Sequence, residues 1–174
     1  DFANKYCPHR TLDMGWERFL NMIREKMEQE TVAIPITENK PTSQPSGIIA
    51  DIQSTLNSRY GLSIAVDNVY GKETKKALVK ALQTELNIQY NRGLVVDGIF
   101  GSKTKSKCVS IKKGAKGNIT YILQSLLTGN RYDTNGVDGI FGSGTEKAVK
   151  KYQEEHGLTV DGIAGRNTFE KLCV

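Results

Sequence analysis

The sequence predicts an all-α protein in which two small three-helix modules stand in tandem, preceded by a linker and one amphipathic helix. Two observations lead to this class. Apolar residues recur every three to four positions in several segments, which is the period of a helix with one buried face. A motif of the form Asp-[Gly/Asn]-x-x-Gly-x-x-Thr also occurs four times between residues 67 and 168, and such internal repeats indicate repeated structural units.

The composition limits the protein class. Of the 174 residues, 38% are hydrophobic and 25% are charged, a mixture typical of globular proteins that argues against wholesale disorder. No run approaches the roughly 18 apolar residues of a membrane-spanning helix, so we expect no membrane partner. The three cysteines, Cys7, Cys108 and Cys173, are too few and too scattered for a disulfide framework.

The N-terminal part predicts one helix and a linker. Apolar residues from Trp16 to Met27 recur at helical spacing, but one short helix cannot bury them alone. We therefore expect residues 1–30 to be the C-terminal remnant of a domain that precedes residue 1. Residues 31–47 hold three of the four prolines and no apolar period, which predicts an extended linker.

The four motifs divide the rest of the chain into two units, 48–109 and 112–174. Each unit begins with a helical pattern, which stops at Gly61 in the first and at Gly129 in the second. A motif, a middle helix, a second motif and a short last helix follow. The first unit diverges, because Asn68 replaces the first motif glycine. In the second unit, residues 143–146 have the spacing of a helix capping box.

The motif residues are expected to be structural, and Phe100 and Phe141 within them are expected to pack in the core. Glycine permits backbone angles that are closed to other residues, and aspartate bonds to nearby backbone N–H groups. A calcium loop is a poor alternative, since position twelve of the candidate at 133–144 is Gly144 instead of Glu. The predicted structural turn residues are Asp67, Gly71, Asp97, Gly101, Asp138, Gly142, Asp161 and Gly165.

The second unit resembles a known family. Leu123-Gln124, the run from Val137 to Val149, Tyr152-Gln153 and the run from Gly157 to Thr168 are similar to the peptidoglycan-binding-like domain of bacterial and phage wall hydrolases. The first unit is similar to a more divergent copy of it. The resemblance implies non-catalytic attachment to peptidoglycan, which brings a tethered hydrolase to its polymer.

A second resemblance lies at the N-terminus. Lys5-Tyr-Cys7-Pro8 and the residues that follow look like the end of a zinc-dependent N-acetylmuramoyl-L-alanine amidase domain. The resemblance implies that Cys7 is a zinc ligand and that Lys5 stabilises the oxyanion, both in an intact parent enzyme that holds the zinc. His9 and His156 do not stand where the family places its zinc histidines, so this chain cannot assemble the site and we expect no cofactor in it.

A glycan with a short peptide calls for an aromatic face and a few amide or guanidinium donors. The candidates for wall binding are Gln53, Arg59, Tyr60, Gln124, Arg131, Tyr132, Tyr152 and Gln153. For the glutamines and Tyr152 a purely structural role is an equal alternative.

The charge pattern leaves a second class of partner open. Residues 1–45 carry six Lys/Arg against seven Asp/Glu, and the remaining 129 residues carry 18 against 12. This basic part suits anionic wall polymers as well as peptidoglycan. The resemblance to wall hydrolases implies a protein outside the cell or in a Gram-positive wall, with release from a phage-infected host as one route to it. The alternative is a basic helical module that binds nucleic acid or protein. Against nucleic acid, the sequence shows no lysine stripe on one helix.

Overall fold

The computed structural model describes residues 47–174. The predicted linker up to residue 46 lies outside the described residues, and so do the amphipathic helix and the predicted amidase remnant with Lys5, Cys7 and His9. Residues 47–174 all belong to one compact unit. Among residues 47–174 none of the helices is both long and apolar enough to cross a membrane.

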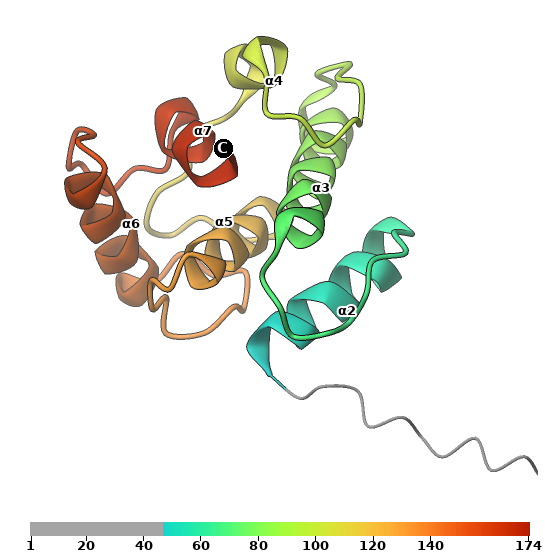
Figure 1. Cartoon of the computed structure of the whole chain (residues 1–174). Coiled ribbons are helices and arrows are strands. Elements are labelled where there is room, and N and C mark those ends of the chain that lie inside the picture. The colour runs from blue at the N-terminus through green and yellow to red at the C-terminus, as the bar shows by residue number, and fades with distance from the viewer. Residues whose placement is uncertain (1–46) are drawn as a thin grey trace, which may run out of the picture. The chain divides into compact units, whose positions relative to one another are not determined.

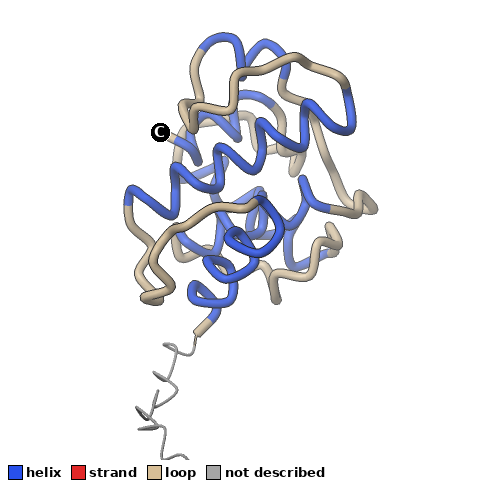
Figure 2. Tube along the Cα trace, turned by 90° about the vertical axis from the view of Figure 1, so that its right-hand side faces the viewer, coloured by secondary structure: helices blue, strands red, loops and turns tan. Residues whose placement is uncertain are grey.

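The predicted all-α class is confirmed. Residues 47–174 form six helices, arranged as in Figure 1 and joined by loops without strands (Figure 2). The helices are α2 (Ile48–Tyr60), α3 (Lys72–Tyr90), α4 (Ser102–Lys107), α5 (Asn118–Gly129), α6 (Ser143–Glu155) and α7 (Arg166–Cys173). We call residues 48–109, with α2 to α4, the first repeat, and residues 112–174, with α5 to α7, the second repeat.

Most predicted helix ends agree with the structure. Gly61 ends α2 in the left-handed conformation at φ 61°, and α5 ends at Gly129. The capping-box prediction is wrong, because Gly142 is the N-cap of α6 and no side chain caps that helix. Thr145, within the predicted box, instead accepts a hydrogen bond from the buried Gln124 side chain.

The middle helices differ in length more than the sequence suggests. The spacing from the motif Thr to the next Gln is only one residue longer in the first repeat, yet α3 has 19 residues and α6 has 13. Gly157, at φ 64°, stops α6 soon after Gln153, whereas α3 continues seven residues past Gln83. A glycine in the left-handed region is a common helix terminator.

A single hydrophobic cluster runs through both repeats. In Figure 1, α5 lies between α3 on one side and α6 on the other, and α5 packs on both. Phe100 and Phe141 are buried in this cluster, as the sequence predicts. Tyr70, from the first repeat, packs so closely on Gly129 that a Cβ there would lie 2.1 Å from its ring. The repeats are therefore distinct in sequence but continuous in their core.

Candidate ligand-binding surface

The four motifs fold into four nearly identical turns, each tied to a buried glutamine of the preceding helix. In the third turn, the Gln124 amide nitrogen donates to Asp138 Oδ1 at 2.9 Å, to the Ile140 carbonyl at 3.1 Å and to Thr145 Oγ1 at 3.1 Å. Its amide oxygen accepts from the Gly139 N–H at 2.7 Å. The same contacts recur for Gln53, Gln83 and Gln153.

The aspartates complete these turns while remaining at the surface. Asp138 Oδ1 also accepts from the Ile140 N–H at 2.8 Å. The Gln124 amide, followed by this backbone donor, lowers the pKa of Asp138, because both stabilise the charged carboxylate. The pKa values of Asp67, Asp97 and Asp161 are lowered in the same way, with the backbone donor as the leading cause at Asp161.

The two motif glycines have different roles. The residue after each aspartate is left-handed, with φ between 60° and 79°, and Asn68 takes this conformation in the first turn. Asparagine tolerates it better than most residues, which explains the substitution. The second glycine of each motif is a helix N-cap with φ between −110° and −89°, which other residues can adopt. The expectation that both glycines need special backbone angles is therefore wrong for Gly71, Gly101, Gly142 and Gly165.

The structure places the predicted wall-binding glutamines inside the turns. Gln53, Gln124 and Gln153 are at most 2% exposed, and so is Tyr152. Tyr152 stacks on His156 with ring centroids 3.9 Å apart. It also forms a T-shaped pair with Tyr132, whose ring centroid is 5.1 Å from its own. The amide groups of the three glutamines are taken up by the turns, so a ligand can reach them only if the turns open.

Arg59 and Tyr60 join the two repeats. The Tyr60 hydroxyl donates to Glu85 Oε1 at 2.9 Å, and the Asn118 amide donates to the same oxygen at 2.7 Å. Glu85 is only 4% exposed. Arg59 donates to Asn118 Oδ1 at 2.6 Å. Its guanidinium carbon lies 5.6 Å from the Tyr121 ring centroid. Sequence reasoning missed Glu85, since no pattern in the chain marks an acid that accepts hydrogen bonds from both repeats.

Arg131 and Tyr132 lie on the loop after α5. Arg131 is exposed and left-handed at φ 67°. Tyr132 donates its hydroxyl to Glu155 and packs near Lys151, whose ammonium is 5.9 Å from the ring centroid. Partial burial, followed by the bond to Glu155, raises the pKa of Tyr132 to about 12. Of the eight predicted wall-binding residues, Arg59 and Arg131 are exposed and Tyr60 and Tyr132 are half-buried.

Two asparagine clamps were also missed. Asn57 donates to the Ile64 carbonyl at 2.8 Å and accepts from the Ile64 N–H at 3.0 Å. Asn87 holds both backbone groups of Leu94 in the same way, at 2.8 Å and 2.7 Å. Each asparagine stands four residues after a turn glutamine, and this repeated spacing could have identified them. The clamps hold the loops of the first repeat against the preceding helices.

The described residues offer no assembled metal site. Among residues 47–174, no group of three or more His, Cys, Asp or Glu side chains lies close enough to hold a metal ion. Burial raises the pKa of the Cys108 thiol to about 12 and also raises that of Cys173. Both thiols are therefore protonated at neutral pH and are poor ligands and nucleophiles.

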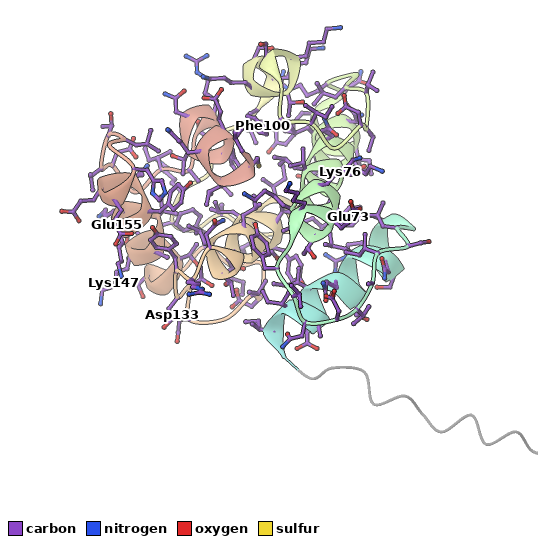
Figure 3. All side chains as sticks on the ribbon, viewed as in Figure 1. Glu73, Lys76, Phe100, Asp133, Lys147 and Glu155 are labelled. Atoms are coloured by element: carbon purple, nitrogen blue, oxygen red, sulfur yellow. The ribbon has the colours of Figure 1, made fainter. Side chains whose placement is uncertain are left out.

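The surface is hollowed beside α3 in the first repeat. A hollow of about 350 Å³ lies between residues 63–69 and the first turn of α3, and a second of about 200 Å³ lies farther along the helix. A larger cleft of about 640 Å³ is lined by Tyr70, the first turns of α3, Asn130 and the last residues of the chain. Figure 3 shows Glu73 and Lys76 on α3, on the side of the molecule away from Lys147 and Glu155 on α6.

Known proteins are similar to the second repeat and, in a longer alignment, to almost the whole chain. Residues 116–172 match the family model described as a putative peptidoglycan binding domain. The chain is 47% identical over 62 residues to the spore cortex-lytic enzyme of Bacillus cereus, an alignment covering 36% of this chain and 24% of that protein. It is 32% identical over 111 residues to the N-acetylmuramoyl-L-alanine amidase CwlL of Bacillus licheniformis, covering 63% of this chain and 31% of the enzyme.

A longer alignment reaches a probable N-acetylmuramoyl-L-alanine amidase of Bacillus licheniformis, with 28% identity over 99% of this chain and 58% of that protein. The chain thus spans between about a quarter and somewhat more than half of the length of these relatives. The second repeat is similar to the putative peptidoglycan binding domain, and the chain is similar to parts of enzymes named as cortex-lytic enzymes and N-acetylmuramoyl-L-alanine amidases.

Proposed function

We propose that the two repeats are a non-catalytic peptidoglycan-binding region that holds an N-acetylmuramoyl-L-alanine amidase at its substrate. The match of residues 116–172 to the putative peptidoglycan binding domain carries this proposal. The first repeat extends it, because its two turns have the same buried Gln–Asp–Thr contacts as those of the second. The parent enzyme is a phage endolysin or a bacterial autolysin that acts in the wall of a Gram-positive cell.

Catalysis, in this proposal, belongs to the part of the parent enzyme that precedes the repeats. Zinc would activate water there, with Cys7 as one ligand and Lys5 as the cation that stabilises the oxyanion. The similarity of almost the whole chain to a probable amidase supports this assignment. The repeats would raise the local concentration of the catalytic part at its polymer without taking part in bond cleavage.

The test is co-sedimentation of the complete 174-residue chain with purified Gram-positive peptidoglycan from which teichoic acid has been removed. We expect the protein to pellet with the wall at both low and high salt, because a groove that recognises sugar or peptide depends only partly on charge. A protein that stays in the supernatant at both salt concentrations, with stripped walls and with walls that retain teichoic acid, would rule the proposal out. Binding only to walls that retain teichoic acid would reassign the ligand to anionic polymers.

One observation favours a second candidate, a nucleic-acid-binding surface. Lys72, Lys76 and Lys80 stand four residues apart on α3, so they share one face of that helix. The expectation that no lysine stripe exists on one helix is therefore wrong. A duplex binder loses affinity steeply as salt rises. Titration of the same chain with duplex DNA at several salt concentrations separates the candidates, since tight binding with such a slope would favour nucleic acid.

A further inference from the structure

The surfaces of the two repeats differ beside the middle helices α3 and α6, although the glutamine, aspartate and threonine of each first turn have the same spacing. In each repeat the turn aspartate stands 14 positions after the helix glutamine, and the turn threonine stands 21 positions after it. Residues 62–66 therefore correspond to residues 133–137. One position before the threonine, the first repeat has Glu73 and the second has Gly144. This residue faces the loop in both repeats, and its identity accounts for the difference between the two surfaces.

In the second repeat the loop lies directly on α6. A Cβ atom at Gly144 would lie 2.8 Å from the Thr134 carbonyl oxygen and 2.6 Å from the Asn135 Cβ. Real Cβ atoms do not approach backbone this closely. The missing side chain of Gly144 is thus what allows the loop to pack against the helix, and this contact fills the space beside the first turn of α6.

In the first repeat the corresponding loop stands off from α3. Glu73 occupies the position of Gly144, and Asn57 holds both backbone groups of Ile64 toward α2. Ser63 and Ile64, the counterparts of Thr134 and Asn135, line both hollows together with Glu73. We call these two adjoining hollows, of about 350 and 200 Å³, the first-repeat groove.

The groove has a mixed chemical character. Small and apolar side chains of Leu62, Ile64, Ala65 and Ala77 form part of its wall. Lys72, Lys76 and Lys80 border it along one face of α3, and none of them has a carboxylate within 4 Å among residues 47–174. Glu73 adds a negative charge between the two hollows.

We propose that the first-repeat groove binds the stem peptide of peptidoglycan, through its carboxylates to the lysines of α3 and through its small side chains to the apolar wall. The inference rests on the proposed function and names its ligand. Glu73 suits the free amine of the diamino acid in such a peptide. An acid at the centre of the groove disfavours a polyphosphate, so the charge pattern fits a zwitterionic peptide better than nucleic acid.

The first experiment maps the ligand on the complete chain. The probe is the synthetic tetrapeptide L-Ala-γ-D-Glu-L-Lys-D-Ala, compared with the same peptide carrying both carboxylates as amides. We expect ¹H–¹⁵N NMR shifts at residues 62–65 and 71–74 with the free acid, much weaker shifts with the diamide, and none at residues 133–136 or 142–145. Shifts confined to the second repeat, or equal shifts with both peptides, would overturn the inference.

A matched pair of variants tests the lysines. Lys76 and Lys147 are both exposed and both stand two residues after a turn threonine, one on α3 and one on α6 (Figure 3). Lys76→Glu is expected to weaken tetrapeptide binding about three- to tenfold, the range for loss of an exposed ion pair with added repulsion. Lys147→Glu should leave the dissociation constant unchanged. Equal effects of both substitutions would mean non-specific attraction and would overturn the assignment.

The outcomes separate this inference from the proposed function. Wild-type protein that pellets with peptidoglycan but shows no tetrapeptide shifts refutes the groove assignment and leaves wall binding intact. Wild-type protein that neither pellets nor binds the tetrapeptide refutes both. Thermal melting of the two variants checks that their fold is unchanged, since both substitutions lie at the surface.

Discussion

The two repeats share their turns and differ in their loops. Gln53 and Gln124 make the same contacts to an aspartate, a carbonyl and a threonine, with corresponding distances that agree within 0.2 Å. Yet the loop before the first turn leaves a groove beside α3, whereas Gly144 allows its counterpart to close on α6. The buried glutamines thus maintain the fold in both repeats, while the residue before the motif threonine, Glu73 or Gly144, differs where the adjoining surface differs.

The comparison also shows that the repeat is not the unit of folding. Glu85 of the first repeat accepts a hydrogen bond from Asn118 of the second, and Lys105 pairs with Glu170 at 2.6 Å. The hydrophobic cluster is shared as well. Elements that share one buried core generally unfold together, so damage to either repeat should destabilise both.

The largest expected effect comes from the turn glutamines. Gln124→Leu should lower the free energy of unfolding by about 3 kcal/mol or more, since it leaves the buried Gly139 N–H without its acceptor and removes the three bonds that the amide nitrogen donates within the turn. Gln53→Leu should cost less, because the Asp67 and Asn68 N–H groups that lose their acceptor are less buried than the Gly139 N–H. Urea unfolding followed by circular dichroism measures both. Two separate transitions in either variant would contradict the shared core.

Next comes the glycine that closes the second loop. Gly144→Ala should destabilise the protein by about 1–3 kcal/mol, because the new Cβ overlaps the Thr134 backbone. Glu73→Ala, at the matching exposed position, should change stability by less than about 0.5 kcal/mol. Thermal melting of the two variants checks this contrast. Similar melting temperatures for the two would mean that the loop of the second repeat tolerates a side chain and that Gly144 does not set its position.

A smaller effect is expected from the clamp in the first repeat. Asn57→Ala removes two hydrogen bonds to Ile64 and should cost about 1–2 kcal/mol. Among residues 47–174, the hydroxyl of its counterpart Thr128 forms one hydrogen bond, with the Thr134 hydroxyl at 3.3 Å, so Thr128→Ala should cost less. Hydrogen exchange at the Ile64 amide gives a local measure. Unchanged protection in Asn57→Ala would show that the loop does not depend on the clamp.

The pH dependence tests what all four turns share. The folded pKa values of Asp67, Asp97, Asp138 and Asp161 lie below their ordinary value. Stability from these groups is therefore complete above the unfolded pKa of about 3.9 and is lost as pH falls through the lower folded values. Thermal melts between neutral pH and about pH 2 should show this loss.

Asp138→Asn gives the matched control. Its amide oxygen can still accept the hydrogen bonds from Gln124 and the Ile140 N–H, but the residue no longer titrates. The loss of stability in acid should be smaller in this variant than in the wild type. An identical acid profile would assign the acid sensitivity to other carboxylates, such as Glu146, whose pKa is lowered by Lys113 and then by Lys150.

The sequence by itself determined the local structure. Helical periodicity and the four motifs predicted the all-α class, the helix ends near Gly61 and Gly129 and the buried Phe100 and Phe141, because these depend on contacts between near neighbours in the chain. The spacing of Gln124, Asp138 and Thr145 was visible too, but not the burial of the glutamine. A buried amide that satisfies a turn and an exposed amide that binds a ligand have the same sequence pattern.

Only the tertiary structure decided how the repeats meet and where the surface is open. Tyr70 against Gly129 and Glu85 beside Asn118 join residues more than 30 positions apart, and no local pattern encodes such pairs. The significance of Glu73 and Gly144 likewise appears only when each is placed opposite its loop. Packing is a property of two surfaces in contact, so a sequence that specifies each surface does not by itself reveal the space left between them.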